Sequence, residues 1–177
     1  MCCDDSVKEM ARIVVQQIGV PDIIVNNAGV INKKGKIWEI PKEEFEKVID
    51  INIKGTANVL RHFIPLMIPI NKAIIVNMSS VMATIGVPMA SPYCSSKWAM
   101  EGLSKSVAKE VGGGMTIVTL DPGVVNTEML FTLLGNTSSQ FQTPQKWAMK
   151  AAPMILNLTR THNGASLMVH DPGILPL

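Results

Sequence analysis

Apolar residues recur along this chain with two different spacings, and segments of the two kinds alternate. Spacings of three and four residues, typical of helices with one apolar face, cover residues 6–18, 42–64, 92–111 and 143–159. Short apolar runs, typical of buried strands that end in turns, cover residues 21–29, 73–80, 115–123 and 165–169. This alternation predicts an α/β fold with a parallel sheet.

Three of these helices have an apolar face that can be assigned residue by residue. That of the second helix is expected to comprise Phe45, Val48, Ile49, Ile53 and Leu60. The face of the first helix is expected to comprise Val7, Met10, Val14 and Ile18, and that of the third Trp98, Leu103, Val107 and Val111. Gly19 and Gly112 follow these helices and are expected to end them.

The composition fits one domain over residues 1–177 and excludes several kinds of partner. The chain is 47% hydrophobic and carries a net charge of +2, too small to indicate nucleic acid or an anionic membrane. Its longest apolar stretch, residues 63–70, is too short to span a bilayer. Cys2, Cys3 and Cys94 have no metal-ligand or disulfide spacing, so no metal is expected and a reduced, cytosolic setting fits.

Polar or turn-forming residues follow three of the expected strands. The strand ends read NNAG (26–29), NMSS (77–80) and LDPG (120–123). Because ligands bind beyond the carboxyl ends of the strands in such sheets, the three segments predict a binding site at this edge.

The only tyrosine of the chain, Tyr93, stands four residues before Lys97. One helical turn separates them, so the two side chains can meet. A nearby cation favours phenolate, so Lys97 is expected to lower the pKa of Tyr93 and suit it to general acid–base work. A tyrosine that anchors a helix beside a solvated lysine would show the same pattern, so the pair alone leaves both interpretations open.

Ser80 closes the second strand, 13 residues before Tyr93. A hydroxyl at this strand end can hold a carbonyl oxygen by hydrogen bonding while Tyr93 protonates it. The alternative is that Ser79 and Ser80 only terminate the strand.

Four motifs together resemble those of the short-chain dehydrogenase/reductase family in order and spacing. They are NNAG (26–29), NMSS (77–80), YCSSK (93–97) and DPGVVNTEM (121–129). The resemblance implies a Rossmann-like, doubly wound parallel sheet that binds NAD(P), an oxidoreductase activity on a small-molecule carbonyl substrate, and a homo-oligomer.

The resemblance also implies roles for single residues. Tyr93 matches the catalytic acid/base, Lys97 the residue that lowers the tyrosine pKa and binds the nicotinamide ribose, and Ser80 the hydroxyl that orients the carbonyl. Asn52 matches an asparagine that organises a proton-relay water; without the family it would be an ordinary polar residue of a long helix. The residues matched to cofactor binding are Asn26, Ala28, Gly29, Tyr93, Lys97, Pro122, Gly123, Val125 and Thr127.

Three further segments resemble plant reductases of pterin aldehydes. They are GVPDIIVNNAGVINKKGKIWEI (19–40), NVLRHFIPLM (58–67) and ILNLT with NGASLMV (155–159, 163–169). This implies reduction of a pterin aldehyde to the alcohol by hydride from NADPH, with NADH also possible. Residues 129–146 match the substrate loop of the family, although ordinary packing would explain their apolar residues equally well.

The chain departs from the family pattern at its N-terminal half. No Gly-rich turn follows a strand, and Gly112–Gly114 precedes one, so the phosphate-binding unit is expected to be missing and the sheet incomplete. The strand at 21–25 would then be an exposed edge. Two hypotheses follow: an oxidoreductase whose catalytic half is this chain, or an inactive form that associates with full-length subunits.

Overall fold

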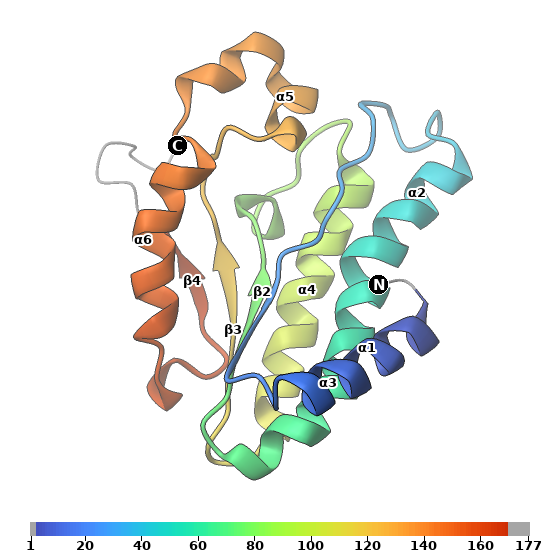
Figure 1. The fold of residues 1–177 in the computed structure, drawn as a ribbon. Coiled ribbons are helices and arrows are strands. Elements are labelled where there is room, and N and C mark those ends of the chain that lie inside the picture. The colour runs from blue at the N-terminus through green and yellow to red at the C-terminus, as the bar shows by residue number, and fades with distance from the viewer. Residues whose placement is uncertain (1–2, 170–177) are drawn as a thin grey trace.

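Four parallel strands form the centre of the computed structural model, which describes residues 3–169 (Figure 1). In chain order they are β1 (Ile23–Asn26), β2 (Ile74–Met78), β3 (Thr116–Asp121) and β4 (Ser166–Met168). They lie side by side in that same order, and every neighbouring pair is parallel. The predicted α/β fold with a parallel sheet is confirmed.

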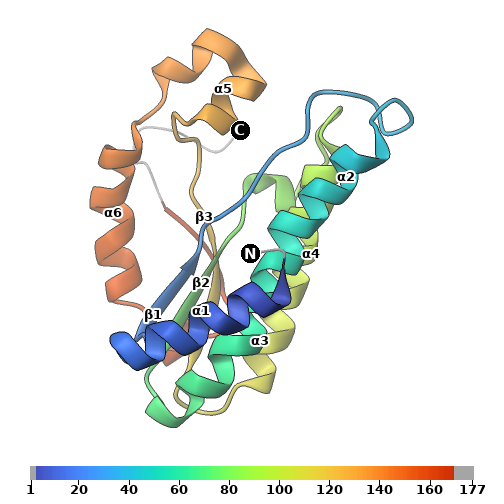
Figure 2. The ribbon, with the colours of Figure 1, turned by 45° about the vertical axis from the view of Figure 1, so that its right-hand side comes forward.

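Helices cover both faces of this sheet, as the views in Figures 1 and 2 show. The α-helices are α1 (Asp4–Gln17), α2 (Lys42–Ile49), α3 (Gly55–Met67), α4 (Ser91–Glu110), α5 (Glu128–Leu134) and α6 (Pro144–Leu156). Shorter 3₁₀ turns are η2 (Ile68–Ile70), η3 (Val81–Ala83), η4 (Gly135–Gln140) and η5 (Arg160–His162). Helices α3 and α4 lie on one face, α6 lies on the other, and α5 lies beyond the carboxyl ends of the strands.

The helix expected over residues 42–64 is interrupted by a π-helical turn, η1 (Asp50–Lys54), which joins α2 to α3. The helical run continues to Met67, because Pro65 lies inside α3 without ending it. A π turn widens the helix locally and often marks a functional position.

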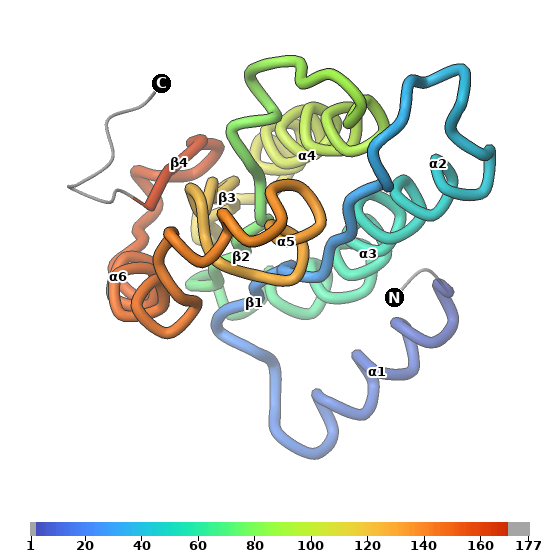
Figure 3. Tube along the Cα trace, turned by 90° about the horizontal axis from the view of Figure 1, so that it is seen from above, coloured from blue at the N-terminus to red at the C-terminus, as the bar shows by residue number. Residues whose placement is uncertain are grey.

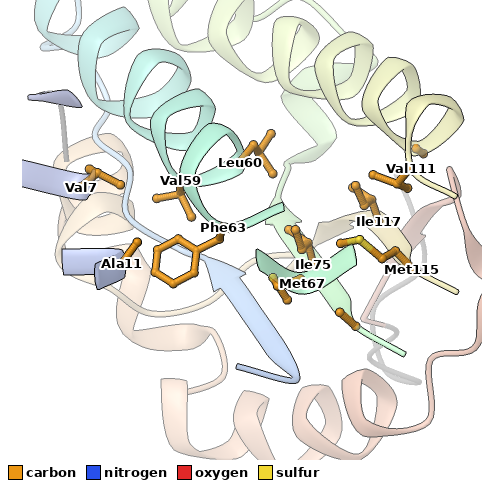
Figure 4. Close-up of a cluster of buried hydrophobic side chains, with 12 residues drawn as sticks. Val7, Ala11, Val59, Leu60, Phe63, Met67, Ile75, Val111, Met115 and Ile117 are labelled. Carbon is orange, nitrogen blue, oxygen red and sulfur yellow. The ribbon is translucent and has the colours of Figure 1, made fainter. Parts of the chain in front are cut away.

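Two apolar clusters form the core, one on each face of the sheet. Successive strand residues point to opposite faces, so Ile75 packs toward α3 and α4 while Val76 packs toward α6. Figure 4 shows the first cluster, in which Phe63 and Met67 of α3 lie against Ile75. Strands that bury both faces need continuous apolar runs, which is the pattern in this sequence.

Two helix faces differ from the sequence expectation. Helix α1 packs on α3 through Val7 and Ala11, so Met10 is 41% exposed. Ile18 follows the last residue of α1 and is 85% exposed. Trp98 is 53% exposed because it points away from the sheet, where it lines a surface hollow with Pro88.

Strand β1 pairs with β2 alone among the residues that the structure describes, and its Val25 is 43% exposed. Seen from above, α1 lies beyond β1 and beside α3 (Figure 3). Within the described residues 3–169, the strand expected at residues 21–25 is therefore an exposed edge of the sheet.

The remaining expectations concern short segments. Gly114 lies so close to Asn71 that a Cβ atom there would clash with the Asn71 backbone oxygen, so this glycine serves a tight turn before β3. Cys3 and Cys94 are free thiols, and Cys2 lies outside the described residues. Within residues 3–169, no helix has the length and apolar character to cross a bilayer, and no group of metal-ligating side chains gathers.

Candidate active site

The carboxyl edge of the sheet brings Ser80, Tyr93 and Lys97 together. Ser80 is the second residue after β2. Tyr93 lies in the first turn of α4, which begins at Ser91 and has Pro92 in the same turn. Lys97 lies one turn further, with its Nζ atom 5.5 Å from the centre of the Tyr93 ring. Tyr93 and Lys97 are only 7% and 6% exposed, so the lysine is not a solvated surface residue.

The Ser80 side chain is oriented by the turn that it begins. Ser80 is the N-cap residue of η3, and its Oγ atom accepts a hydrogen bond of 3.2 Å from the Met82 amide. The same hydroxyl is hydrogen-bonded to Tyr93. A carbonyl oxygen at this point would therefore meet two hydroxyl groups.

The pKa of Tyr93 does not follow the sequence expectation. Burial raises it to about 12, from its ordinary value of 10.0, while the hydrogen bond with Ser80 acts in the opposite direction. Asp121 and Cys94 add to the increase. The expected lowering by Lys97 is thus wrong for the protein without ligands, because desolvation of the phenolate is the larger effect.

Lys97 uses its ammonium group to hold the end of β2. Its Nζ atom donates a hydrogen bond of 2.7 Å to the Met78 backbone oxygen. Burial lowers the pKa of Lys97 to about 8, and Asp121 acts in the opposite direction. An ammonium group has three N–H donors, so two remain besides the one given to Met78.

Asn52 lies in the π turn and is 1% exposed. Its Oδ1 atom accepts from the Val30 amide at 2.8 Å, and its Nδ2 atom donates to the Val30 oxygen at 3.0 Å and to Ser96 Oγ at 2.9 Å. Ser96 Oγ in turn donates to the backbone carbonyl oxygen of Tyr93 at 2.7 Å. Asn52 therefore joins the turn after β1 to the helix that carries Tyr93 and Lys97.

Asn26 ends β1, and Ala28 and Gly29 lie in the turn that follows it. The Asn26 amide is buried and donates to Asn77 Oδ1 at 2.7 Å, so its side chain is used within the sheet. Ala28 is exposed, and Gly29 lies against the Asn52 amide, where a Cβ atom would be 3.4 Å from Oδ1. The turn thus presents backbone and a small side chain outward.

The segment after β3 makes a second exposed turn. Gly123 has φ of +67° and its amide donates to the Asp121 carboxylate at 2.9 Å. Val125 forms a bridge with Gln142, and Thr127 Oγ1 accepts from the Leu130 amide at 3.2 Å at the start of α5. Pro122 is half-buried. These residues lie at the carboxyl edge of the sheet, near β2 and its Ser80, because β2 and β3 are paired neighbours.

This set of groups fits the nicotinamide half of a dinucleotide. Lys97 offers two N–H donors to ribose hydroxyls, and the Thr127 hydroxyl still has a proton to donate to a carboxamide oxygen. Ala28 and Gly123 leave room for close backbone approach. Among the described residues no Gly-rich turn follows a strand, so the fit covers this half of the cofactor only.

Sequence reasoning missed the polar residues that hold the site together. The most connected is Glu101 of α4, whose carboxylate accepts hydrogen bonds from Ser79, Thr119 and Ser166. Another is Asn32, which is 1% exposed, donates to the Met89 oxygen at 3.0 Å and accepts from the Tyr93 amide at 3.4 Å. Glu101 stands four residues after Lys97, a spacing that could have identified it; nothing in the sequence marks Asn32.

Three comparisons found known proteins that are similar to this chain. The family model for short chain dehydrogenases matches residues 3–135. An NADPH-dependent pterin aldehyde reductase from Arabidopsis thaliana is 60% identical over 166 residues, which are 94% of this chain and 69% of the relative. A 3-oxoacyl-acyl-carrier-protein reductase, FabG, from Staphylococcus epidermidis is 34% identical over 77% of this chain and 56% of its own length.

The structure comparison agrees with the sequence comparisons. The structure of ElxO with NADP bound has a TM-score of 0.84 and 26% identity, covering 95% of this chain and 73% of that chain. The fold and the family match therefore define a Rossmann-like oxidoreductase. The chain belongs to the short chain dehydrogenase family, and it spans 56–69% of the length of the two curated relatives above.

Proposed function

We propose that this chain carries the catalytic half of an NADPH-dependent reductase that converts a pterin aldehyde to the corresponding alcohol. The observation that carries the proposal is the group of Ser80, Tyr93 and Lys97 at the carboxyl edge of the sheet, in which Tyr93 and Lys97 are buried. The 60% identity to a reductase of this name supports the substrate class and the cofactor.

The phenol of Tyr93 is the proton donor in this proposal. Its raised pKa, about 12, keeps it protonated at neutral pH, which is the form that a carbonyl reduction needs. Ser80 holds the carbonyl oxygen through its hydroxyl group, beside the phenol to which it is hydrogen-bonded. As the oxygen accepts the proton from Tyr93, the aldehyde becomes an alcohol.

Lys97 and Thr127 hold the cofactor in this proposal. When bound, NADPH supplies the hydride that reduces the carbonyl carbon. Lys97 donates to the ribose, Thr127 and the Val125 backbone hold the carboxamide, and Pro122 with Gly123 shapes their turn. The turn of Asn26, Ala28 and Gly29 lies along the adenosine side, with Asn26 serving to hold the turn rather than to touch the ligand.

In this proposal Asn52 positions the site, and the chain forms part of a larger assembly. Asn52 fixes α4 to the turn after β1, which keeps Tyr93 and Lys97 in place. We also propose that the chain is one domain of a cytosolic homo-oligomer, supported by the free edge of β1 and by exposed Val25 and Trp98. The alternative of an inactive subunit has no contact among the described residues that favours it.

The test is aldehyde reduction by this chain and by the same chain joined to a Gly-rich βαβ unit. We expect 6-formylpterin to be reduced with NADPH, faster than an aliphatic aldehyde or a ketosteroid. Tyr93→Phe should lower the rate about 10²–10⁴-fold while the fold is kept, because general acid catalysis contributes that much. Near-normal turnover by the Phe variant would end the assignment, and a preference for another carbonyl would end the substrate proposal.

A further inference from the structure

The Glu101 carboxylate lies between α4 and three strands of the sheet, and it is 15% exposed. Its Oε1 atom accepts from Ser79 Oγ at 2.5 Å. Its Oε2 atom accepts from Thr119 Oγ1 at 3.0 Å and from Ser166 Oγ at 2.5 Å, and lies 3.2 Å from Lys105 Nζ. A single side chain thus joins α4 to β3, β4 and the residue that follows β2.

We infer that Glu101 is a positioning residue that fixes Ser80 and Met78 against Tyr93 and Lys97. The inference rests on the proposed function, because those four residues form its catalytic group and its lysine anchor. Lys97 and Glu101 are one helical turn apart on the face of α4 that meets the sheet. Lys97 donates a hydrogen bond to the Met78 backbone oxygen, and Glu101 accepts one from the Ser79 hydroxyl. Two successive turns of α4 are therefore hydrogen-bonded to two consecutive residues of the chain.

Ser80 is the next residue after Met78 and Ser79. Its hydroxyl orientation therefore depends on where Ser79 is held. Ser79 also donates its amide to the Leu120 oxygen at 2.8 Å, so the backbone alone ties it to β3. Among residues 3–169, the hydrogen bond to Glu101 is the one that ties the Ser79 side chain to the helix that carries Tyr93. A shift of Ser80 of about 1 Å relative to Tyr93 would cost up to about hundredfold in rate.

Two serines on the same carboxylate provide a matched pair of variants. Ser79→Ala removes the bond to Oε1 and with it the link to the catalytic edge. Ser166→Ala removes the bond to Oε2, which reaches β4 and no catalytic residue. Each change deletes one hydroxyl from a 2.5 Å hydrogen bond. A merely structural role of Glu101 predicts that the two variants behave alike.

Tyr93 supplies a signal that does not need activity. It is the only tyrosine, so carbon-13 labelling of the tyrosine ring gives a single reporter at the site. We expect Ser79→Ala and Glu101→Ala to shift or split this signal, and Ser166→Ala to leave it in place. Glu101→Gln keeps one acceptor oxygen and should retain most of the wild-type signal.

The kinetic arm uses the same variants in the reduction of 6-formylpterin, with thermal unfolding as the control for folding. We expect kcat to fall about tenfold to hundredfold for Ser79→Ala with little change in KM, and Ser166→Ala to keep the wild-type kcat. Equal effects of Ser79→Ala and Ser166→Ala on the Tyr93 signal would overturn the inference, as would no effect of either. If the tyrosine signal responds as expected but no aldehyde is reduced, the proposed function fails and the positioning role stands.

Discussion

Tyr93 shows how the surroundings of one side chain set its chemistry. Lys97 is 5.5 Å from the ring centre, yet burial dominates and raises the pKa of the phenol to about 12. The Lys97 ammonium is itself desolvated, which lowers its pKa to about 8 and weakens it as a fixed positive charge above that pH. The pair is therefore a protonated donor beside a lysine that titrates near working pH.

A first prediction follows from the single tyrosine. In the native chain Tyr93 should stay un-ionised at pH 10.5, whereas in denaturant it should be more than half ionised, because the ordinary pKa is about 10. The tyrosinate absorbance of native and denatured samples measures this directly. A raised folded-state pKa stabilises the native state below pH 10, and this contribution is lost as the pH rises through about 12. Equal ionisation in the two samples at pH 10.5 would contradict the burial of the phenol.

A second prediction concerns Lys97→Met. Lowering the lysine pKa from 10.5 to about 8 corresponds to a cost of roughly 3 kcal/mol, which the variant removes while losing one hydrogen bond. We expect the variant to bind NADPH more weakly yet unfold at an equal or higher temperature at pH 7. Between pH 8 and 10.5 the unfolded wild-type chain binds more protons than the native one, so the wild type gains stability and the advantage of the variant shrinks.

The control for this effect is Lys72→Met, at an exposed position. This variant removes the same charge from the surface, so the comparison isolates the effect of burial. Unfolding curves at several pH values compare the two variants. A difference for Lys97→Met that is independent of pH would show that this lysine is not desolvated.

The helical segment that carries Asn52 contains a π turn, and this turn positions the Asn52 side chain. The π turn at Asp50–Lys54 places the Asn52 amide inward, where it meets Val30 and Ser96. In a regular helix the side chains that follow would be offset by one residue. The turn after β1 and the helix α4, far apart in sequence, are joined through this one amide.

A third prediction tests that junction. Asn52→Ala should lower the free energy of unfolding by about 1–3 kcal/mol, because it leaves the Val30 amide and oxygen without their partner in the interior. Urea denaturation measures the loss. Asn27→Ala changes an exposed residue in the turn after β1, so its free energy of unfolding should stay within about 0.5 kcal/mol of the wild type. Similar losses for the two variants would show that the π turn does not organise the site.

At the level of the whole molecule, our proposal gives the described residues one half of a dinucleotide site. Strand β1 has one partner, and α1 lies beyond it beside α3 (Figure 3). The groups fitted to the nicotinamide are all at the carboxyl edge, whereas backbone donors for a pyrophosphate are expected from a Gly-rich turn at a helix start.

A fourth prediction follows from that division. This chain alone should bind NADPH about tenfold or more weakly than the same chain joined to a Gly-rich βαβ unit, a difference of about 1.4 kcal/mol or more. Calorimetric titration of both proteins compares the affinities, and size-exclusion chromatography reports whether the free edge of β1 associates. Equal affinity would show that the phosphate contacts are dispensable.

Local patterns in the sequence are sufficient for the four strands, for the helices other than α5, for their order and for the parallel sheet, because helices and buried strands impose their own periodicity on apolar residues. The strand ends and the pair Tyr93–Lys97 are also local, so their meeting at one edge follows from the topology. The tertiary structure alone decides the pKa values, the π turn and the contacts of Glu101 and Asn32. These depend on burial and on partners distant in sequence, such as Ser166, 65 residues after Glu101, and no periodicity encodes them.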